Sequence, residues 1–176
     1  QVEVTITGES MDDSYELLFS HPKLTAKPKL AADGKAEPNK FIVTIAADAP
    51  RGVHDARLMT RLGVSSARAF VVDTMPEVIR VKPNTSLETA MELQPNSICN
   101  AAITRRAVDF YSFQGVKGKR MAVDCAAAGI DSKLTAVLIV ADAQGRDVLV
   151  NRTGGVLDFT PPADGKYFIK VHGLTY

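Results

Sequence analysis

The 176-residue sequence contains no tryptophan, only two cysteines and three histidines, and no long apolar run. A membrane-spanning helix needs about 18 or more consecutive apolar residues, so we expect no membrane insertion. The net charge is only +1, so the chain lacks the excess of Lys and Arg with which proteins bind polyanions, and we expect no nucleic-acid partner. The 45% hydrophobic content is typical of globular proteins.

Catalytic motifs are missing as well. His21, His54 and His172 are scattered along the chain, and no nucleophile elbow, His-Glu-x-x-His motif or phosphate-binding glycine loop accompanies them. Cys99 and Cys125 have no second cysteine pair beside them, so they do not form a zinc motif. We therefore expect a chain that is not an enzyme and holds no cofactor.

Alternation of apolar and polar residues predicts β-strands throughout. Val2, Val4 and Ile6 share one face of a first strand, and the apolar run 41–45 predicts a central strand. Further strands of the first half are expected at 16–19, 24–27, around 56–62 and at 69–72, with a polar loop tip at 31–39. Strands of the second half are expected at 97–103, 108–113, 120–126, 134–141, 148–151, 156–160 and 167–172.

Two turns organise the C-terminal part. Asp142 and Gly145 predict a hairpin turn between apolar runs, because aspartate bonds nearby backbone and glycine accepts a left-handed conformation. A second turn, at Asp164 and Gly165, leads into a strand in which alternation puts Tyr167, Ile169 and Val171 on one face.

The strand rhythm breaks at residues 73–82. We therefore predict an all-β fold of two β-sandwich domains, an immunoglobulin-like domain at 1–74 and a jelly-roll-like domain at 77–176. The sequence from Thr85 to Glu88 matches a capping box, which predicts either a short helix at 85–91 or a coiled loop. The chain enters directly on a strand and stops at Tyr176 without a closing loop, so we expect a fragment whose second domain is truncated at its C-terminal end.

Two segments resemble known families. Residues 52–58, followed by Leu62-Gly63-Val64-Ser65, resemble the C-terminal half of immunoglobulin-like IPT/TIG modules. The second half resembles bacterial pre-peptidase C-terminal (PPC) domains, which are related to the collagen-binding modules of clostridial collagenases. The segments that carry this second resemblance are Pro83-Asn84 with Ala90, 108–113, 117–120, 137–145 and 163–167. The tandem resembles domains of large secreted proteins of planctomycete-type bacteria.

The PPC resemblance implies a calcium site in some members, formed by an acidic segment before the first strand and by carboxylates near the strand start. Glu77, Asn84 and Asp109 are the candidate ligands that remain here. Calcium takes six to eight oxygens, several of them anionic. Arg80, Lys82 and Ala107 stand where the family pattern has ligands or their carboxylates, so we expect no bound metal.

Cys99 and Cys125 are both expected to point into the interior of the second sandwich, by alternation with their neighbours. Two such thiols can either form a disulfide or remain buried and free. The resemblance to secreted proteins and the even cysteine count favour a Cys99–Cys125 disulfide.

A ligand platform is the other site that the residues suggest. An exposed Tyr111 or Phe168 would offer a ring for stacking a sugar or packing a peptide, whereas core packing is the alternative for each. Arg105 and Arg106 form a basic spot nearby that could meet a polyanionic or carboxylate-rich ligand, unless it is simply a solvated turn.

Taken with the resemblance, these features predict a non-catalytic binding or spacer module of a larger exported bacterial protein. Its location would be secreted, periplasmic or at the cell surface. Its partner would be a polysaccharide or protein at the cell surface, or neighbouring domains of the same chain. The alternative is an accessory pre-peptidase-type domain that assists a secreted protease or other hydrolase. An independent hydrolase has no group of residues to support it.

Overall fold

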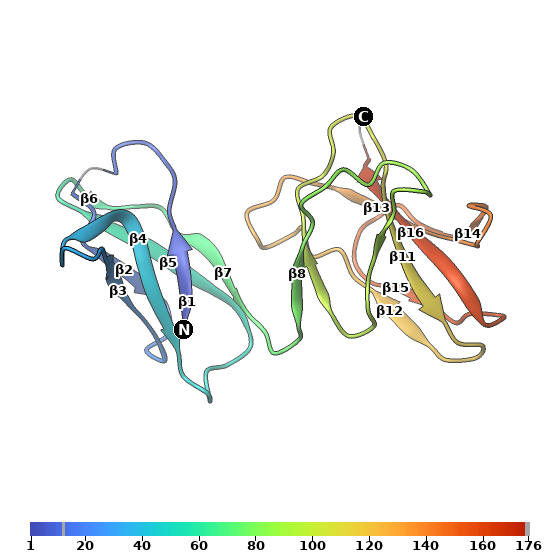
Figure 1. The fold of residues 1–176 in the computed structure, drawn as a ribbon, viewed down its shortest axis with the longest axis horizontal. Helices are drawn as coiled ribbons and strands as arrows, with labels where there is room; N and C mark the ends of the chain where they lie inside the picture. The colour runs from blue at the N-terminus through green and yellow to red at the C-terminus, as the bar shows by residue number, and fades with distance from the viewer. Residues whose placement is uncertain (12, 175–176) are drawn as a thin grey trace. The chain divides into compact units, whose positions relative to one another are not determined.

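The computed structural model describes residues 1–11 and 13–174, and Figure 1 shows their ribbon. Thr175 and Tyr176, where truncation is expected, lie outside the described residues. The described residues form strands and turns without any helix, and their sheets pack in a sandwich-like way, which confirms the all-β prediction. No helix in this part of the chain is therefore long and apolar enough to cross a membrane.

The chain divides into two compact units. The first contains residues 1–74 together with 129–131, and the second contains the remaining described residues from 75 onward. Each unit has its own cluster of buried apolar side chains.

The first unit contains two sheets. One has the strand order β1-β4-β3, and in the other β5 pairs with β2, β6 and β7. The strands are β1 (Val2–Thr5), β2 (Glu16–Phe19), β3 (Leu24–Leu30), β4 (Ala36–Ile45), β5 (Gly52–Thr60), β6 (Gly63–Val64) and β7 (Arg68–Val72).

Both sheets of the first unit contribute to its core. Phe41 and Val43 of β4 are 1% and 0% exposed, and they pack with Leu17 of β2 and Leu58 of β5. Full burial of each such side chain contributes about 1.5–3 kcal/mol. The prediction that 41–45 is a central strand is confirmed, because β4 lies between β1 and β3. The predicted loop tip at 31–39 is too long, since β4 already begins at Ala36 and Leu30 pairs with Ala36.

The second unit is built on a five-stranded sheet with the order β14-β13-β16-β11-β9. In Figure 1 the long red strand β16 lies between β13 and β11. Two smaller sheets, β12-β15 and the parallel pair β10-β8, complete the unit. The strands are β8 (Glu77–Ile79), β9 (Met91–Glu92), β10 (Ile98–Asn100), β11 (Asp109–Gly115), β12 (Met121–Val123), β13 (Ala136–Ala141), β14 (Asp147–Asn151), β15 (Leu157–Phe159) and β16 (Gly165–Gly173).

The core of the second unit lies between the five-stranded sheet and the β12-β15 pair. Tyr167 and Ile169 of β16 belong to this core and Val171 packs against it, which confirms that the three share one face. The ring of Tyr167 packs against Phe113 and Phe159, with centroids 5.8 and 5.2 Å apart. Aromatic pairs at such separations contribute beyond their buried area.

The predicted hairpin turn is confirmed between β13 and β14. The Asp142 carboxylate accepts hydrogen bonds from the backbone N–H groups of Gln144 and Arg146, at 2.9 and 3.0 Å. Gly145 has φ +78°, and a Cβ built there would lie 2.6 Å from Leu87 Cδ1. Glycine is therefore required both by the backbone and by the neighbouring Leu87.

The short helix at 85–91 is absent, and the coiled alternative is correct for most of the segment. Ser86 and Thr89 bond each other in both directions, Ser86 N to Thr89 Oγ1 at 3.1 Å and Thr89 N to Ser86 Oγ at 3.3 Å. These side-chain bonds replace the helical ones, and Met91 then enters β9 beside β11.

Candidate functional site

The candidate site lies where the segment after β8 meets the start of β11. Asn84 and Asp109, two of the predicted metal ligands, are each 1% exposed there. Asn84 pairs with Phe110 twice: its Nδ2 donates to the Phe110 carbonyl at 2.6 Å, and the Phe110 N–H donates to the Asn84 carbonyl at 2.7 Å. One backbone and one side-chain hydrogen bond therefore hold the segment that contains Asn84 against β11.

Arg80 occupies the centre of this site. Its Nη1 lies 2.5 Å from Asp109 Oδ1, 2.5 Å from Asn84 Oδ1 and 3.2 Å from Thr104 Oγ1. Its Nη2 donates to the carbonyl oxygen of Ala102. A guanidinium therefore sits among four oxygens from four residues.

The second oxygen of Asp109 is also engaged, because Oδ2 accepts the Thr104 N–H at 2.8 Å. Oδ1 differs: it is fully buried and close to Arg80, yet no directed hydrogen bond reaches it. The contact of this oxygen is therefore its ion pair with Arg80.

This ion pair is shielded from water. The Arg80 side chain is 11% exposed and that of Asp109 is 2% exposed. When one partner of a buried pair is removed, the other charge is left uncompensated, which typically costs about 3–5 kcal/mol. The arrangement therefore fixes residues 80–84 against the strand and the 102–104 loop.

Glu77, the third predicted ligand, does not belong to this cluster. Its Oε2 accepts a hydrogen bond from Asn100 Nδ2 at 2.8 Å on the β8-β10 pair. Across the described ranges, no three His, Cys, Asp or Glu side chains converge as a metal-binding group. The site thus contains one carboxylate and several neutral oxygens.

From the sequence, Arg80 is expected only as a charge that opposes a metal, whereas in the structure it pairs with Asp109. The parallel pairing of β8 with β10 and the bonds between Asn84 and Phe110 bring the two residues together. No local pattern signals such a contact. The available clue was that two basic residues, Arg80 and Lys82, stand in a segment where the family resemblance implies oxygen ligands.

Cys99 and Cys125 both pack against the core of the second unit, as alternation predicts. The structure holds them as free thiols where a disulfide was expected. Burial raises the pKa of both thiols, and for Cys99 the nearby Arg80 charge opposes part of that rise. A raised pKa lowers the thiolate fraction, so both sulfurs are poor nucleophiles in the folded chain.

The predicted aromatic platform is wrong for both rings. Tyr111 is 8% exposed and belongs to the core, and Phe168 is 4% exposed on the other side of the sheet, with Lys166 Nζ 5.2 Å from its ring centre. Burial also raises the pKa of the Tyr111 hydroxyl. A buried ring offers no stacking face, and the consecutive residues Tyr167, Phe168 and Ile169 are all buried, so both faces of β16 are covered at this point.

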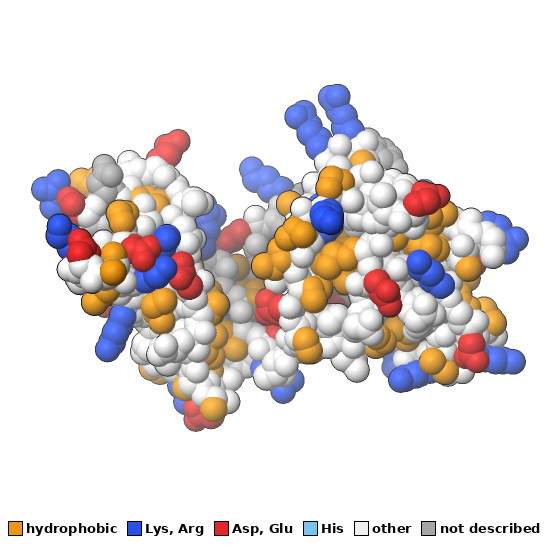
Figure 2. Space-filling view, viewed as in Figure 1, with side chains coloured by type: hydrophobic (Ala, Val, Ile, Leu, Met, Phe, Trp, Pro, Cys, Tyr) orange, Lys and Arg blue, Asp and Glu red, His pale blue; other side chains and the backbone are white. Residues whose placement is uncertain are grey.

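Arg105 and Arg106 lie exposed in the loop before β11, and Arg106 adopts a positive φ of 56°. The solvated-turn alternative therefore describes this spot. Figure 2 shows that acidic side chains are interspersed with Lys and Arg on the visible face of each unit.

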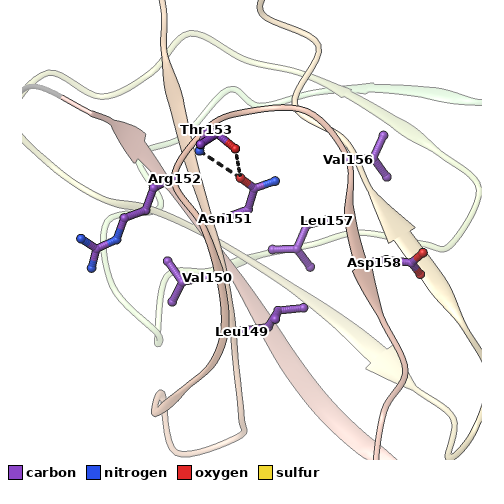
Figure 3. Close-up of a pocket in the computed structure, with 8 residues that line it drawn as sticks. All are labelled: Leu149, Val150, Asn151, Arg152, Thr153, Val156, Leu157 and Asp158. Carbon is purple, nitrogen blue, oxygen red and sulfur yellow. Dashed lines mark hydrogen bonds between the residues drawn. The ribbon is translucent and has the colours of Figure 1, made fainter.

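A surface hollow of about 510 Å³ lies between the end of β14, the following loop and β15. Figure 3 shows Leu149, Val150 and Leu157 lining it beside the polar Asn151 and Thr153. The Asn151 Oδ1 accepts bonds from the N–H and hydroxyl of Thr153, each at 3.0 Å. The carboxylate of Asp158 is paired with Arg120. Asn151 and Thr153 thus bond each other and Asp158 is paired with a residue outside the hollow, and no nucleophile and base are placed together among the lining residues.

Comparison with protein-family models found no match for this chain. Part of the chain is similar to part of a probable subtilase-type serine protease of Deinococcus radiodurans, with 37% identity over 71 residues. The match covers 38% of this chain and only 10% of that protein.

Proposed function

We propose that this chain is a non-catalytic binding or spacer module of a larger exported bacterial protein. The similarity to a stretch of a subtilase-type protease carries this proposal, because a stretch one tenth of that protein's length need not include its catalytic domain. The all-β architecture is consistent with an accessory domain. In this proposal the first unit is an IPT/TIG-like sandwich and the second is a PPC-like sandwich.

The pairing of the buried carboxylate and the burial of the two thiols support a non-catalytic module. The buried carboxylate of Asp109 is paired with Arg80, and the burial-raised pKa values of Cys99 and Cys125 leave little thiolate. Catalytic groups need an accessible reacting atom and a base within hydrogen-bond reach. Among the described residues, neither the buried centre nor the hollow beside β14 offers that combination.

The expected setting is outside the cytoplasm, either secreted, periplasmic or at the cell surface. There the module would hold a neighbouring domain of the same chain in place or dock it on a polysaccharide or protein. Incubating the purified chain with insoluble cellulose, chitin, peptidoglycan and collagen, followed by sedimentation, separates these roles. Retention on one polymer supports binding, and no retention supports a spacer.

The same preparation tests the absence of catalysis. We expect no hydrolysis of fluorescently labelled casein above the buffer rate. Hydrolysis that a serine-protease inhibitor abolishes, and that persists after repurification, would contradict the proposal.

A second candidate function is an accessory role for a protease or other hydrolase elsewhere in the full chain, which the subtilase similarity specifically favours. Deleting these 176 residues from the full-length protein should then leave hydrolysis of a soluble peptide unchanged and lower hydrolysis of an insoluble protein substrate. Equal losses on both substrates would argue against this role.

A further inference from the structure

The edge strand β14 leaves one side of the five-stranded sheet open. Among the described strands it pairs only with β13, so no strand lies opposite the backbone N–H and C=O groups on its other side. Its three middle residues, Val148, Leu149 and Val150, are 46%, 37% and 41% exposed. Consecutive exposed aliphatic side chains on an unpaired edge are a template for the addition of another strand.

The features that usually protect an edge strand are confined to the start of β14. Such protection comes from charged side chains, proline or a bulge. The only charged residue of this strand, Asp147, pairs with Lys170 Nζ at 2.6 Å, and the register with β13 shifts between Asp147 and Leu149. From Leu149 to Asn151 the register is regular, and neither a charge nor a proline interrupts it. This part of the edge is therefore open to pairing.

The core of the sandwich is also uncovered beside this edge. Leu149 pairs with Val140 of β13, so both side chains lie on the same face of the sheet, the face that contributes Val140 to the core. Val140 is 0% exposed whereas Leu149 is 37% exposed, because the hollow of about 510 Å³ separates Leu149 from β15. Leu157 and the 60% exposed Val156 line the same hollow (Figure 3). A further strand beside β14 would supply the apolar side chains that this end of the core lacks.

An unpaired cation lies at the end of the same edge. Arg152 directly follows β14 and is exposed, and its side chain has no hydrogen bond or ion pair within the described ranges. The neighbouring charges are paired, Arg146 with Asp142 and Asp158 with Arg120. Figure 3 shows the Arg152 side chain extending away from the other lining side chains. A carboxylate on a segment alongside β14 would therefore meet an uncompensated guanidinium.

We propose that β14 binds an extended segment of a partner protein as an additional antiparallel strand. Backbone hydrogen bonds to residues 149–151 hold the segment, and one of its aliphatic side chains enters the hollow. An acidic side chain near the N-terminal end of the segment reaches Arg152. The antiparallel direction follows the sheet, in which the pairs from β14 through β13 and β16 to β11 are all antiparallel.

The occupant is a polypeptide because the open edge consists of backbone groups. Only another extended chain carries N–H and C=O groups at the spacing that continues a ladder, while pockets for alternate side chains provide specificity. A polysaccharide has hydroxyl groups in their place. The inference names the partner of a binding module, so it rests on the binding form of the proposed function.

The direct test uses a synthetic peptide, Asp-Val-Thr-Val-Thr-Val-Thr, acetylated at its N-terminus and labelled with fluorescein at its C-terminal end. Versions with isoleucine or leucine in place of valine offer larger side chains to the hollow. Fluorescence anisotropy should show saturable binding to the complete 176-residue chain. Two analogues are N-methylated at the odd or at the even positions, and these positions lie on opposite edges of an extended peptide. One analogue should bind about tenfold more weakly or worse, and the other should bind like the parent peptide.

Variants of the hollow test where the peptide binds. Val156→Asn and Leu149→Asn make the hollow polar, and each should weaken binding about tenfold. Val156 lies in the loop before β15, so its replacement leaves the strands unchanged. Val116→Asn, at a 52% exposed aliphatic residue elsewhere in the second unit, is the matched control and should bind like the native chain.

A charge exchange tests the role of Arg152. A peptide with lysine in place of its aspartate should bind the native chain about fivefold more weakly, as expected for an exposed ion pair. The Arg152→Glu chain should reverse this preference and bind the lysine peptide more tightly. Arg105→Glu changes an exposed arginine outside the hollow and should leave the preference unchanged.

Four results would overturn the proposal. One is no binding of any of these peptides to the native chain, and another is equal binding of the two N-methylated analogues. A native chain that dimerises between about 10 and 200 μM, with the dimer lost in Leu149→Asn, would assign the edge to a second copy. Retention on an insoluble polymer that Leu149→Asn abolishes would assign the hollow to a polysaccharide. The polymer and casein assays on the native chain test the proposed function separately, so failure of the peptide assays is distinguishable from failure of that function.

Discussion

The ring of Tyr167 lies directly over the backbone of Gly115, so closely that a Cβ on residue 115 would lie 2.7 Å from Cδ2 of the tyrosine. Gly115 ends β11, and the register that pairs Phe113 with Tyr167 places Gly115 opposite Gly165. The same Cβ would lie 3.0 Å from Pro161 Cγ. Because residue 115 has no side chain, the Tyr167 ring can pack directly against the backbone of β11.

Replacing Gly115 with alanine should destabilise the second unit by about 1–3 kcal/mol, because the added methyl overpacks a rigid neighbourhood. Urea unfolding measures this as a lower midpoint with an unchanged slope. Gln114→Ala on the same strand is the matched control, since Gln114 is exposed, and it should stay within about 0.5 kcal/mol of the native chain. Equal stability of the two variants would show that the ring moves freely.

Tyr167→Phe should cost about 0.5–1.5 kcal/mol, as expected for the loss of one hydrogen bond. The Tyr167 hydroxyl donates to the Ala163 carbonyl at 3.0 Å, whereas the ring contacts with Phe113 and Phe159 are preserved in the variant. Tyr15→Phe, at a residue 52% exposed, should be neutral by comparison. Thermal unfolding monitored by circular dichroism distinguishes the two variants. A Tyr167→Phe chain as stable as the native chain would contradict this account.

The raised thiol pKa values predict how Cys99 and Cys125 react. In protein prepared under reducing conditions, reaction with a thiol reagent should be slow at pH 7–8 and should still accelerate as the pH rises above the ordinary thiol value of about 8.5. Denatured protein, in which both thiols regain ordinary pKa values, is the control. A native rate equal to the denatured rate would contradict burial of the sulfurs.

The same pKa shifts affect stability. A thiol whose pKa is raised by folding stabilises the fold below its unfolded pKa, and that contribution is lost as the pH rises through the folded pKa. We therefore expect the free energy of unfolding to fall above about pH 8.5, and a Cys99→Ser/Cys125→Ser chain to lose less over that range.

The oxidation state in an oxidising compartment remains a separate prediction. Protein exported to such a compartment should contain close to zero free thiols when assayed in denaturant without reductant, because we expect Cys99 and Cys125 to form a disulfide there. Two reactive thiols would show that they stay free, as they are in the structure.

Calcium and chelators should leave the native chain unchanged. Arg80 fills the space among the oxygens of Asn84, Thr104 and Asp109, so an added divalent ion would have to displace a buried guanidinium. The melting temperature in 5 mM calcium chloride and in 5 mM EGTA should agree within the scatter of repeats. A rise of about 4–8 °C in calcium, equivalent to roughly 1 kcal/mol, would mean that metal binds elsewhere or displaces Arg80.

Separate expression of residues 1–74 and 77–176 tests whether each unit folds alone. Each unit has its own buried cluster, so each fragment should give a dispersed β-type NMR spectrum. Collapsed spectra from both fragments would indicate a single fused core.

Local sequence patterns were sufficient to predict the all-β class, the turn at Asp142 and Gly145, and the shared face of Tyr167, Ile169 and Val171. These features depend on a period of two and on local backbone preferences, which neighbouring residues specify. The helix predicted at 85–91 is absent although the sequence matches a capping box. Ser86 and Thr89 bond each other instead, and Leu87 packs against Gly145.

Which polar groups come into contact could not be predicted from local patterns, because it depends on the assembled fold. Arg80 and Asp109 come from segments far apart in the chain, and their pairing depends on how β8, β10 and β11 are assembled. Likewise, alternation assigned Phe168 to the face opposite Tyr167, but only the packing of that second face showed that the ring is buried. Local sequence specifies the direction in which a side chain points, and the assembled sheets specify what it contacts.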